Sequence, residues 1–179
     1  PPAQIISVWP SAGDFTTISG QPRNRLAGLD ATTGAATGWA PNPNAAVHSL
    51  ASDGSTVFVG GNFSTIGGQP RPFLAALDAT TGVASAWNPA VMTGGTVLAV
   101  SGSTVYAGGD FTGMGGQARN RIAALDATSG VPAGWNPNAN NTVFALAVDG
   151  STVYAGGLVT VVGGKVRKRI AALDAGTGL

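Results

Sequence analysis

The chain has a 48-residue internal repeat, and this period constrains its fold more than any other feature. A shift by one period places Phe63 on Phe111 and Trp87 on Trp135. The spacing never slips over three periods, so each unit is expected to occupy an equivalent structural position without loop insertions. The aligned positions are Phe15, Phe63, Phe111 and Val159; Arg23, Arg71, Arg119 and Arg167; Asp30, Asp78, Asp126 and Asp174; and Trp39, Trp87 and Trp135.

Each unit has the pattern of four short strands. Residues 143–148 form an apolar run, an Asp-Gly hairpin signal follows, and residues 152–155 alternate, which predicts two antiparallel strands. A glycine pair then opens a loop towards a third strand, expected over residues 122–125 in the preceding repeat. A turn leads from there into a fourth strand that ends near Trp135.

Four strands in a unit of this length are typical of one blade of a β-propeller. A helical solenoid would need a 3.6-residue apolar period, which is absent, and a β-helix is the alternative all-β architecture. We therefore expect an all-β chain of four-stranded antiparallel blades, with about four blades' worth of sequence. The expected boundaries are 1–12 for a degenerate start of the first blade, 13–60, 61–108 and 109–156 for repeats, and 157–179 for a partial repeat, all in one propeller or a fragment of one.

Composition narrows the partners. The chain has 28 glycines, 11 prolines, no cysteine and a formal net charge of +1. The lack of cysteine excludes disulfides and thiol chemistry, and the sparse charge argues against a nucleic-acid partner. No apolar run is long enough to cross a bilayer as a helix, so membrane insertion is not expected.

The residues Gly-Gly-Asn-Phe-Ser-Thr-Ile-Gly-Gly-Gln-Pro-Arg at 60–71, followed by Leu-Ala-Ala-Leu-Asp-Ala-Thr-Thr-Gly at 74–82, resemble the delta-sixty repeat of bacterial secreted and surface proteins. The resemblance covers nearly the whole chain. It implies a propeller fold and an extracellular or cell-surface location, with no catalytic residues to transfer. The first repeat departs from the pattern, because residues 9–12 read Trp-Pro-Ser-Ala where residues 57–60 read Val-Phe-Val-Gly.

A second resemblance is to the propeller repeats of quinone-dependent dehydrogenases, which carry Ala-x-Asp-x-x-Thr-Gly followed by a tryptophan that docks on the next blade. Ala76, Asp78, Thr81 and Gly82 match this stretch, whereas Trp87 lies one residue further along. The resemblance implies the docking role for the tryptophan and not the dehydrogenase chemistry.

Two recurring residue types have both a structural and a functional interpretation. The aspartates could ligate a hard cation, but one carboxylate per turn favours a turn-forming role in which each accepts backbone N–H bonds. The tryptophans could stack on sugars, but a large aromatic once per repeat favours a plug between blades. The residues expected between blades are Trp39, Trp87, Trp135, Phe15, Phe63 and Phe111, and those expected to form turns are Asp30, Asp78, Asp126 and Asp174.

All nine basic residues fall in one five-residue window of the repeat, so a closed ring would gather them on one face or rim. One interpretation is an arginine band that binds anionic groups of a glycan or partner; the other is structural pairing of each arginine with an aspartate. The candidate ligand-binding residues are Arg23, Arg25, Arg71, Arg119, Arg121, Arg167 and Arg169, and the window also holds Lys165 and Lys168.

No catalytic constellation, metal site or cofactor site is predicted. His48 is the only histidine, and its counterparts in the next repeats are Thr96 and Phe144. We therefore expect a non-catalytic secreted or cell-surface module of structural or interaction type, with a glycan- or anion-binding lectin as the alternative and an enzyme with a ring-centre site as a remote one.

The length is not a whole number of repeats, so unpaired strand edges are expected at the ends. Three arrangements fit: an excerpt of a longer propeller, a ring completed by a partner chain, and a four-bladed ring sealed by its own ends. The expected partners are accordingly other protein chains or further blades of the same parent protein, with a surface glycan as the alternative.

Overall fold

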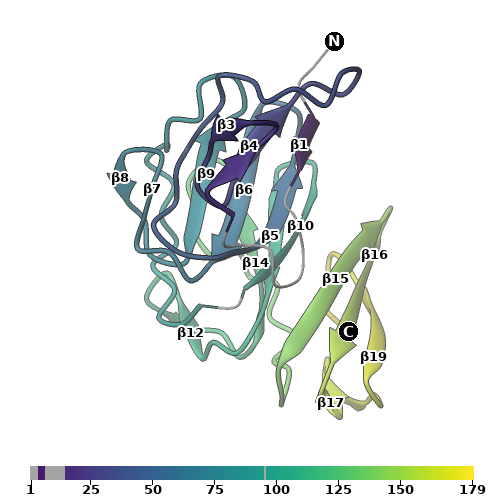
Figure 1. Cartoon of the computed structure of the whole chain (residues 1–179). Coiled ribbons are helices and arrows are strands. Elements are labelled where there is room, and N and C mark those ends of the chain that lie inside the picture. Colours follow the sequence, from purple (N-terminus) through teal and green to yellow (C-terminus); the bar gives the residue numbers. More distant parts are fainter. Residues whose placement is uncertain (1–3, 7–14, 95) are drawn as a thin grey trace.

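A computed structural model describes residues 4–6, 15–94 and 96–179 of the chain, and this part is all-β (Figure 1). It contains β-strands and turns and no helix. The prediction for residues 9–12 lies outside the described residues. The strands are β1 (Gln4–Ile6), β2 (Thr17–Ile18), β3 (Gln21–Pro22), β4 (Ala27–Leu29), β5 (Val47–Ser52), β6 (Thr56–Gly61), β7 (Thr65–Ile66), β8 (Gln69–Pro70), β9 (Leu74–Asp78), β10 (Val97–Ser101), β11 (Thr104–Gly108), β12 (Gly113–Met114), β13 (Gln117–Ala118), β14 (Ile122–Asp126), β15 (Val143–Asp149), β16 (Thr152–Gly157), β17 (Val161–Val162), β18 (Lys165–Val166) and β19 (Ile170–Asp174).

Three sheets repeat the same topology and define three units. The second unit has the strand order β5-β6-β9, the third β10-β11-β14 and the fourth β15-β16-β19. The first unit retains the β1-β4 pair. Every named strand pair is antiparallel. The β-helix alternative, which needs parallel pairing, is therefore wrong.

The 48-residue spacing is retained in the strand register. Thr56 pairs with Asp78 in the second unit, and the pairs at the same place in the next two units are Thr104 with Asp126 and Thr152 with Asp174. Because side chains alternate between the two faces of a strand, an unchanged register puts equivalent side chains on equivalent faces.

A small hairpin links the middle strand of each unit to its third strand. In the third unit this is β12–β13, where Gly115 and Gly116 have φ of 57° and 73°. Two successive positive φ angles suit a tight two-residue hairpin turn and favour glycine there. The glycine pair that the sequence places at the start of a loop is thus the turn of this hairpin.

The segment expected to be a fourth strand meets its sheet at a single isolated bridge. In the second unit, two hydrogen bonds flank this bridge: Asp78 N donates to Val83 O at 2.9 Å, and Ser85 N donates to Ala76 O at 2.9 Å. The chain then leaves the sheet, because Trp87 reaches across to the next unit. The bridges are Leu29↔Ala36, Leu77↔Ala84 and Leu125↔Pro132.

The first unit departs from the common register. In the second unit, Leu77 pairs with Val57. Leu29, which lies one repeat period before Leu77, pairs with Gln4. The sequence change noted at the start of the first repeat therefore coincides with a different strand partner for β4.

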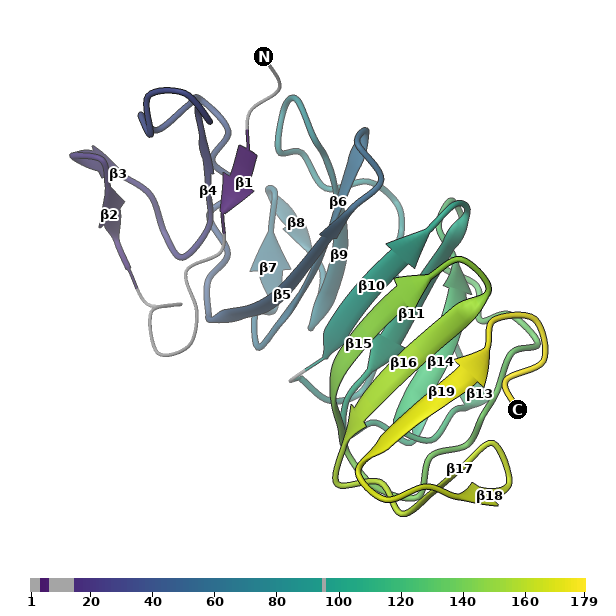
Figure 2. The same cartoon turned by 90° about the vertical axis from the view of Figure 1, so that its right-hand side faces the viewer.

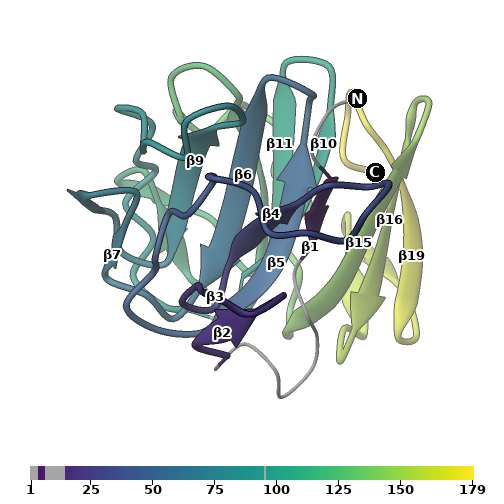
Figure 3. The ribbon, with the colours of Figure 1, turned by 45° about the horizontal axis from the view of Figure 1, so that its top comes forward.

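The units follow one another side by side in chain order (Figure 2). Strand β10 contacts both β5 and β15, so the first strands of the three complete sheets are neighbours, as Figures 2 and 3 also show. The molecule is thus a curved row of sheets, and each sheet packs face to face on the next one.

Each hydrophobic core lies between two successive units rather than within one. The core between the second and third units contains Phe58, Leu74 and Trp87 from one side and Val105 and Leu125 from the other. Equivalent cores join the first unit to the second and the third to the fourth. Each unit therefore depends on its neighbours for the burial of its apolar side chains, as in other linear repeat arrays.

Candidate functional site

The tryptophans join each unit to the next through the same hydrogen bond. Each indole Nε1–H donates to the backbone carbonyl of the aspartate 39 residues further along the chain, and all three rings are buried. A buried tryptophan needs such a partner for its N–H, and the Asp turn supplies it at a constant place. The bonds are Trp39 to Asp78 O at 3.0 Å, Trp87 to Asp126 O at 3.0 Å and Trp135 to Asp174 O at 2.9 Å.

Aromatic packing supports the tryptophans from their own units. Phe58 meets Trp87 edge to face with ring centroids 5.3 Å apart, and Tyr106 meets Trp135 with centroids 5.1 Å apart. Phe63 and Phe111 lie in the same inter-unit cores and have no exposed surface, whereas Phe15 is half-buried. The buried tryptophan rings therefore have little surface on which a sugar could stack.

The recurring aspartates hold turns together. Asp78 Oδ1 accepts hydrogen bonds from Thr80 N at 3.0 Å, Thr81 N at 2.6 Å and Thr81 Oγ1 at 2.8 Å, and Gly82 follows with a φ of 74°. Asp30, Asp126 and Asp174 make the same set of bonds to their own turns. The turns of Asp78, Asp126 and Asp174 pre-shape the carbonyl to which a tryptophan donates.

Hydrogen bonding lowers the pKa of all four turn aspartates below the ordinary value of 3.8. For Asp30, Asp78 and Asp174 the main cause is the backbone N–H of the threonine three residues on. For Asp126 it is the Ser129 hydroxyl, followed by the Ser129 backbone N–H. Donors directed at a carboxylate favour its charged form.

One arginine of each of the first three repeats donates to backbone carbonyls, not to aspartates as the pairing hypothesis expected. Arg71 Nε and Nη2 donate to Ser85 O at 3.1 and 2.5 Å, and Nη1 donates to Pro70 O at 2.7 Å. Arg119 reaches Ala133 O at 2.7 Å in the same way, and Arg23 reaches Thr37 O. These guanidinium groups hold the segment with the isolated bridge against its own unit.

A second arginine position has an unusual backbone. Arg25, Arg121 and Arg169 have φ of 60°, 62° and 72°. Each backbone N–H donates to the carbonyl of Phe15, Phe111 or Val159, at 2.8 to 2.9 Å. Left-handed conformations at residues other than glycine cost free energy and persist only where surrounding contacts hold them.

The side chains at this position have different partners. Arg121 Nε lies 3.4 Å from Asp110 Oδ1, an ion pair without hydrogen-bond geometry at Nε. Arg25 Nη1 donates to Pro43 O at 3.4 Å. In the fourth repeat, Lys165, Lys168 and Arg169 are exposed and Arg167 is half-buried. The structure thus does not form one uniform arginine band; its most accessible cations gather at the fourth repeat.

Opposite charges lie at opposite ends of the strands. Asp53 is in the β5–β6 turn and Asp78 pairs with Thr56, so both lie at one end of the second unit, whereas Arg71 precedes Leu74, which pairs with Gly60 at the other end. The repeat extends this arrangement over the other units, with Asp110 as an acid on the basic side. The molecule therefore has an acidic end and a basic end.

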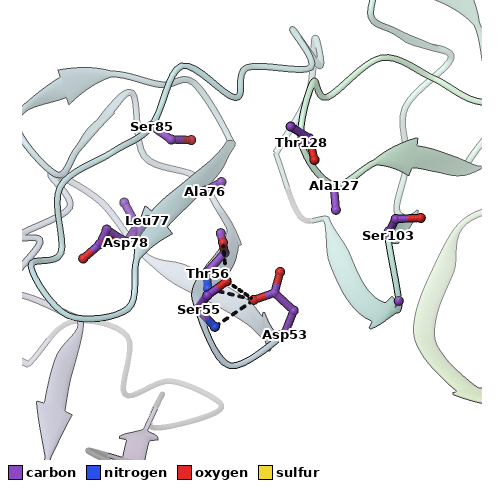
Figure 4. Close-up of a pocket in the computed structure, with 11 residues that line it drawn as sticks. Asp53, Ser55, Thr56, Ala76, Leu77, Asp78, Ser85, Ser103, Ala127 and Thr128 are labelled. Atoms are coloured by element: carbon purple, nitrogen blue, oxygen red, sulfur yellow. Dashed lines mark hydrogen bonds between the residues drawn. The ribbon is translucent and has the colours of Figure 1, made fainter.

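A pocket of ≈ 480 Å³ opens between the second and third units at the acidic end (Figure 4). Asp53 and Ser55 line it from one unit, and Ser103 and Thr128 from the other. Burial raises the pKa of Asp53, but hydrogen bonds from Thr56 and Ser55 outweigh it, so the net shift is downward. Asp53 Oδ1 is already used by Ser55 N, Ser55 Oγ and Thr56 N, at 2.8 to 2.9 Å.

Two asparagines also link units, a role that the sequence interpretation did not predict for them. Asn44 Oδ1 accepts from Ser64 N and Thr65 N, and its Nδ2 donates to Ser64 Oγ at 2.8 Å. Asn140 makes the same three bonds to Thr160 and Val161 of the fourth unit. The signal was available as the two-period spacing of the two asparagines, but Met92 interrupts it in the repeat between them.

Within the described ranges, no three His, Cys, Asp or Glu side chains lie together in a way that could hold a metal ion. The described part of the chain also has no helix long and apolar enough to span a membrane.

Comparison with known proteins bears on the fold. No protein-family model and no curated protein matched the sequence. Among solved structures, the computationally designed Ika8 protein is similar, with 15% identity and a TM-score of 0.59 over 86% of this chain and 41% of that chain. The chain thus spans less than half of the length of this relative, and the likeness indicates an all-β repeat fold.

Two further solved structures match with lower TM-scores. The computationally designed Ika4 protein is 14% identical with a TM-score of 0.36, over 73% of this chain and 92% of that chain. A chain of a Mitotic Checkpoint Complex structure is 19% identical with a TM-score of 0.41, over 86% of this chain and 57% of that chain. Neither score is high enough to carry a structural argument.

Proposed function

We propose that the chain is an array of β-propeller blades that serves as a non-catalytic scaffold or interaction module, on the surface of a cell or secreted from it. One observation carries the proposal: the recurring tryptophan joins each unit to the next, and the recurring aspartate and arginine shape the segments on either side of that contact. Trp87 bonds to the Asp126 carbonyl, Asp126 shapes its own turn, and Arg119 holds the segment that follows. A modular scaffold requires the same docking contact between each pair of successive units.

The propeller assignment is supported by the packing of successive three-stranded sheets face to face with their first strands side by side. The segment with the isolated bridge would be the outer fourth strand of each blade, shortened because the chain turns to the next blade at the tryptophan. The surface location and the delta-sixty relationship rest on the sequence resemblance at residues 60–82.

Duplicating one repeat tests the scaffold proposal. A chain with a second copy of residues 61–108 inserted after residue 108 keeps the phase of the repeat. We expect it to fold with the same far-UV circular dichroism per residue and to appear one blade longer in electron micrographs. Loss of the folded state on duplication would contradict the proposal, since a modular array needs only nearest-neighbour contacts. An insertion of half a repeat is the matched control and is expected to disrupt packing.

Anion binding at the fourth repeat is the second candidate function. Lys165 and Lys168 occupy positions that hold Gln117 and Asn120 in the third repeat, so this repeat alone adds two exposed lysines beside its two arginines. Clustered, exposed cations attract sulfate, carboxylate or phosphate groups, as on an acidic glycan.

A sulfated-glycan array tests this second candidate. The Lys165→Gln and Lys168→Asn double variant installs the residues of the third repeat at the same positions, so it removes two charges with little risk to folding. Binding by the natural chain that is lost in the double variant supports an anion site, whereas equal signals from the two proteins, or none from either, contradict it.

A further inference from the structure

The pocket between the second and third units is lined by side chains with unused hydrogen-bonding atoms. Asp53 Oδ1 is occupied by its own turn, but within the described residues no hydrogen bond or ion pair reaches Oδ2. The hydroxyls of Ser103 and Thr128 likewise make no hydrogen bond to any residue that the structure describes. Figure 4 shows Asp53 Oδ2 on the side opposite to the bonds of its turn, and the hydroxyls of Ser85 and Thr128 directed towards the space between the units.

The walls of this pocket are fixed by contacts of the protein itself. In the third unit, Thr128 N donates to Asp126 Oδ1 at 3.1 Å. Next to it, Ala127 N donates to Ser103 O at 2.9 Å. Trp87 Nε1 donates to Asp126 O at 3.0 Å and so joins the second unit to the same turn. A preformed site loses little conformational freedom when a ligand binds, which favours affinity.

The lining does not suit an anion or a metal ion. Its described residues include no Lys, Arg or His, and the carboxylate of Asp53 repels a negative ligand. A hard cation needs six or more oxygen ligands, whereas Asp78, the second acid of the lining, turns its carboxylate away from the third unit (Figure 4).

The lining instead combines hydroxyls with small apolar groups. Ala76 is buried and Ala127 is half-buried, and both lie beside the hydroxyls of the pocket. The volume of ≈ 480 Å³ is within the range of small-molecule sites. A small ligand that carries both hydroxyls and C–H groups therefore matches the pocket in size and in chemistry.

Three polar side chains of the pocket are absent from the next junction of the same chain. One repeat further on, Asp53 corresponds to Ser101, Ser85 to Ala133 and Thr128 to Gly176. The third and fourth units still dock there, because Trp135 Nε1 donates to Asp174 O at 2.9 Å. Docking of units therefore does not require the three polar side chains, which leaves them available for a ligand.

We propose that this pocket binds a neutral sugar residue. Asp53 Oδ2 accepts hydrogen bonds from the sugar hydroxyls, and Thr128 Oγ1 donates to them or accepts from them. Ser85 Oγ accepts from Trp87 N at 3.2 Å and donates its own hydrogen to the sugar. The C–H groups of the ring pack on Ala76. The site adds a ligand-binding function to the scaffold and is separate from the exposed cations of the fourth repeat.

Titration with uncharged and charged sugars, followed by the amide signals in NMR spectra, tests the class of ligand. The uncharged probes are D-glucose, D-galactose, D-mannose and N-acetyl-D-glucosamine, and the charged probes are D-glucuronate and D-glucosamine. At least one uncharged sugar is expected to shift the signals of residues 53–56, 102–103 and 127–128 saturably, with a dissociation constant in the millimolar range. D-glucuronate is expected to bind at least about tenfold more weakly, because Asp53 repels its carboxylate.

Three outcomes of this titration overturn the proposal. The first is that no uncharged sugar shifts these signals. The second is that D-glucosamine shifts them while the uncharged sugars do not, which would indicate a site for a cationic amine. The third is that D-glucuronate binds as tightly as the uncharged sugars.

Substitutions taken from the next junction test the residues. Asp53→Ser is expected to weaken sugar binding about tenfold or more, since it removes a charged acceptor, and Thr128→Gly about threefold. Asp149→Ser is the matched control, because Asp149 has the same repeat position in the fourth unit, is exposed and does not line the pocket. It makes the same change of charge and is expected to leave the affinity unchanged. Equal affinities of the Asp53→Ser and Asp149→Ser variants overturn the proposal.

A second substitution at Asp53 separates lost binding from lost folding. Asp53→Asn keeps an acceptor oxygen for the turn and places an amide group at the position of Oδ2. It is expected to keep the circular dichroism spectrum of the natural chain and to weaken sugar binding about tenfold. A folded Asp53→Asn variant with the affinity of the natural chain overturns the proposal. Repeat duplication tests the scaffold function separately, so that function stands if sugar binding is not found.

Discussion

Strands β14 and β19 have the same five residues, Ile-Ala-Ala-Leu-Asp, and the same pairing register, but they differ in burial. In β14 all four apolar residues are buried. In β19 burial alternates, and Ile170 and Ala172 are exposed. The third unit is packed on both faces and the fourth on one, so the difference in burial comes from the neighbours and not from the strand sequence.

This comparison explains why the strands of the repeat are apolar at nearly every position. A strand covered on one face needs apolar residues only at alternate positions, whereas a strand packed on both faces is apolar throughout. The sequence of β19 is that of a strand with two covered faces.

Removal of the tryptophan rings is expected to have the largest effect. Trp87→Ala and Trp135→Ala each remove a buried ring and its bond to an Asp carbonyl, so each is expected to lower the free energy of unfolding by about 3–5 kcal/mol. The two variants should loosen different parts of the molecule, because Trp135 docks on the fourth unit, which packs on one neighbour, whereas Trp87 docks on the third unit, which packs on two. Hydrogen exchange should therefore accelerate across β15, β16 and β19 in Trp135→Ala and on both sides of the interface in Trp87→Ala. A uniform acceleration over the whole chain in Trp135→Ala would contradict this.

The two equivalent isoleucines provide the most direct test of the comparison. Ile122→Ala leaves a cavity in a closed core and is expected to cost about 2–5 kcal/mol. Ile170→Ala changes a residue that is 67% exposed and is expected to cost no more than about 0.5 kcal/mol when the chain is monomeric. Urea denaturation at low protein concentration measures both. Similar losses for the two variants would mean that the fourth unit is covered on both faces in solution.

Acid is expected to weaken both units through their turn aspartates. The pKa of Asp126 and of Asp174 is lowered in the folded chain, so their contribution to stability is complete above the unfolded value of 3.8 and is lost as the pH falls through the lower folded value. Asp126→Asn and Asp174→Asn should each lower the melting temperature at neutral pH. The difference in melting temperature between each variant and the natural chain should become smaller in acid, below the pKa of the unfolded chain. A difference that grows in acid would contradict this expectation.

The smallest expected effect concerns the linkers that lead into the two units. Asn140 makes three hydrogen bonds to the fourth unit, whereas Met92, at the same place before the third unit, is 80% exposed. Met92→Asn should supply equivalent bonds to Thr112 and Gly113 and raise the free energy of unfolding by about 1 kcal/mol. Asn140→Ala is the converse control and should lower it by a similar amount. A destabilising Met92→Asn would show that the linker follows a different path.

Part of the candidate site could be predicted from residue type and spacing. An aspartate followed by Thr-Gly within the same few residues forms a local turn whatever surrounds it, because its acceptors and donors are close neighbours in the chain. The resemblance implied that Trp87 docks on the next blade, and its place between units followed from the presence of one large apolar ring per repeat. Its particular partner, the Asp126 carbonyl, did not, because that contact depends on how two units are placed in space.

The arginines show where prediction from sequence was insufficient. The count of acids and bases suggested ion pairs, but the guanidinium of Arg71 reaches Ser85 O, a backbone acceptor that every residue type possesses. Residue identity does not show which backbone carbonyl accepts a hydrogen bond from an arginine, so only the tertiary structure reveals it. The same reason hid the role of Asn44, whose amide meets backbone N–H groups of the next unit.

The sequence by itself determined the 48-residue unit, its antiparallel strands and their common register, because turns and alternating side chains are local properties. The tertiary structure decided which apolar positions are buried, since Ile122 and Ile170 have the same flanking residues in their strands and opposite exposure. Burial is a property of two surfaces in contact, and a strand sequence specifies one of them. The neighbouring unit specifies the other.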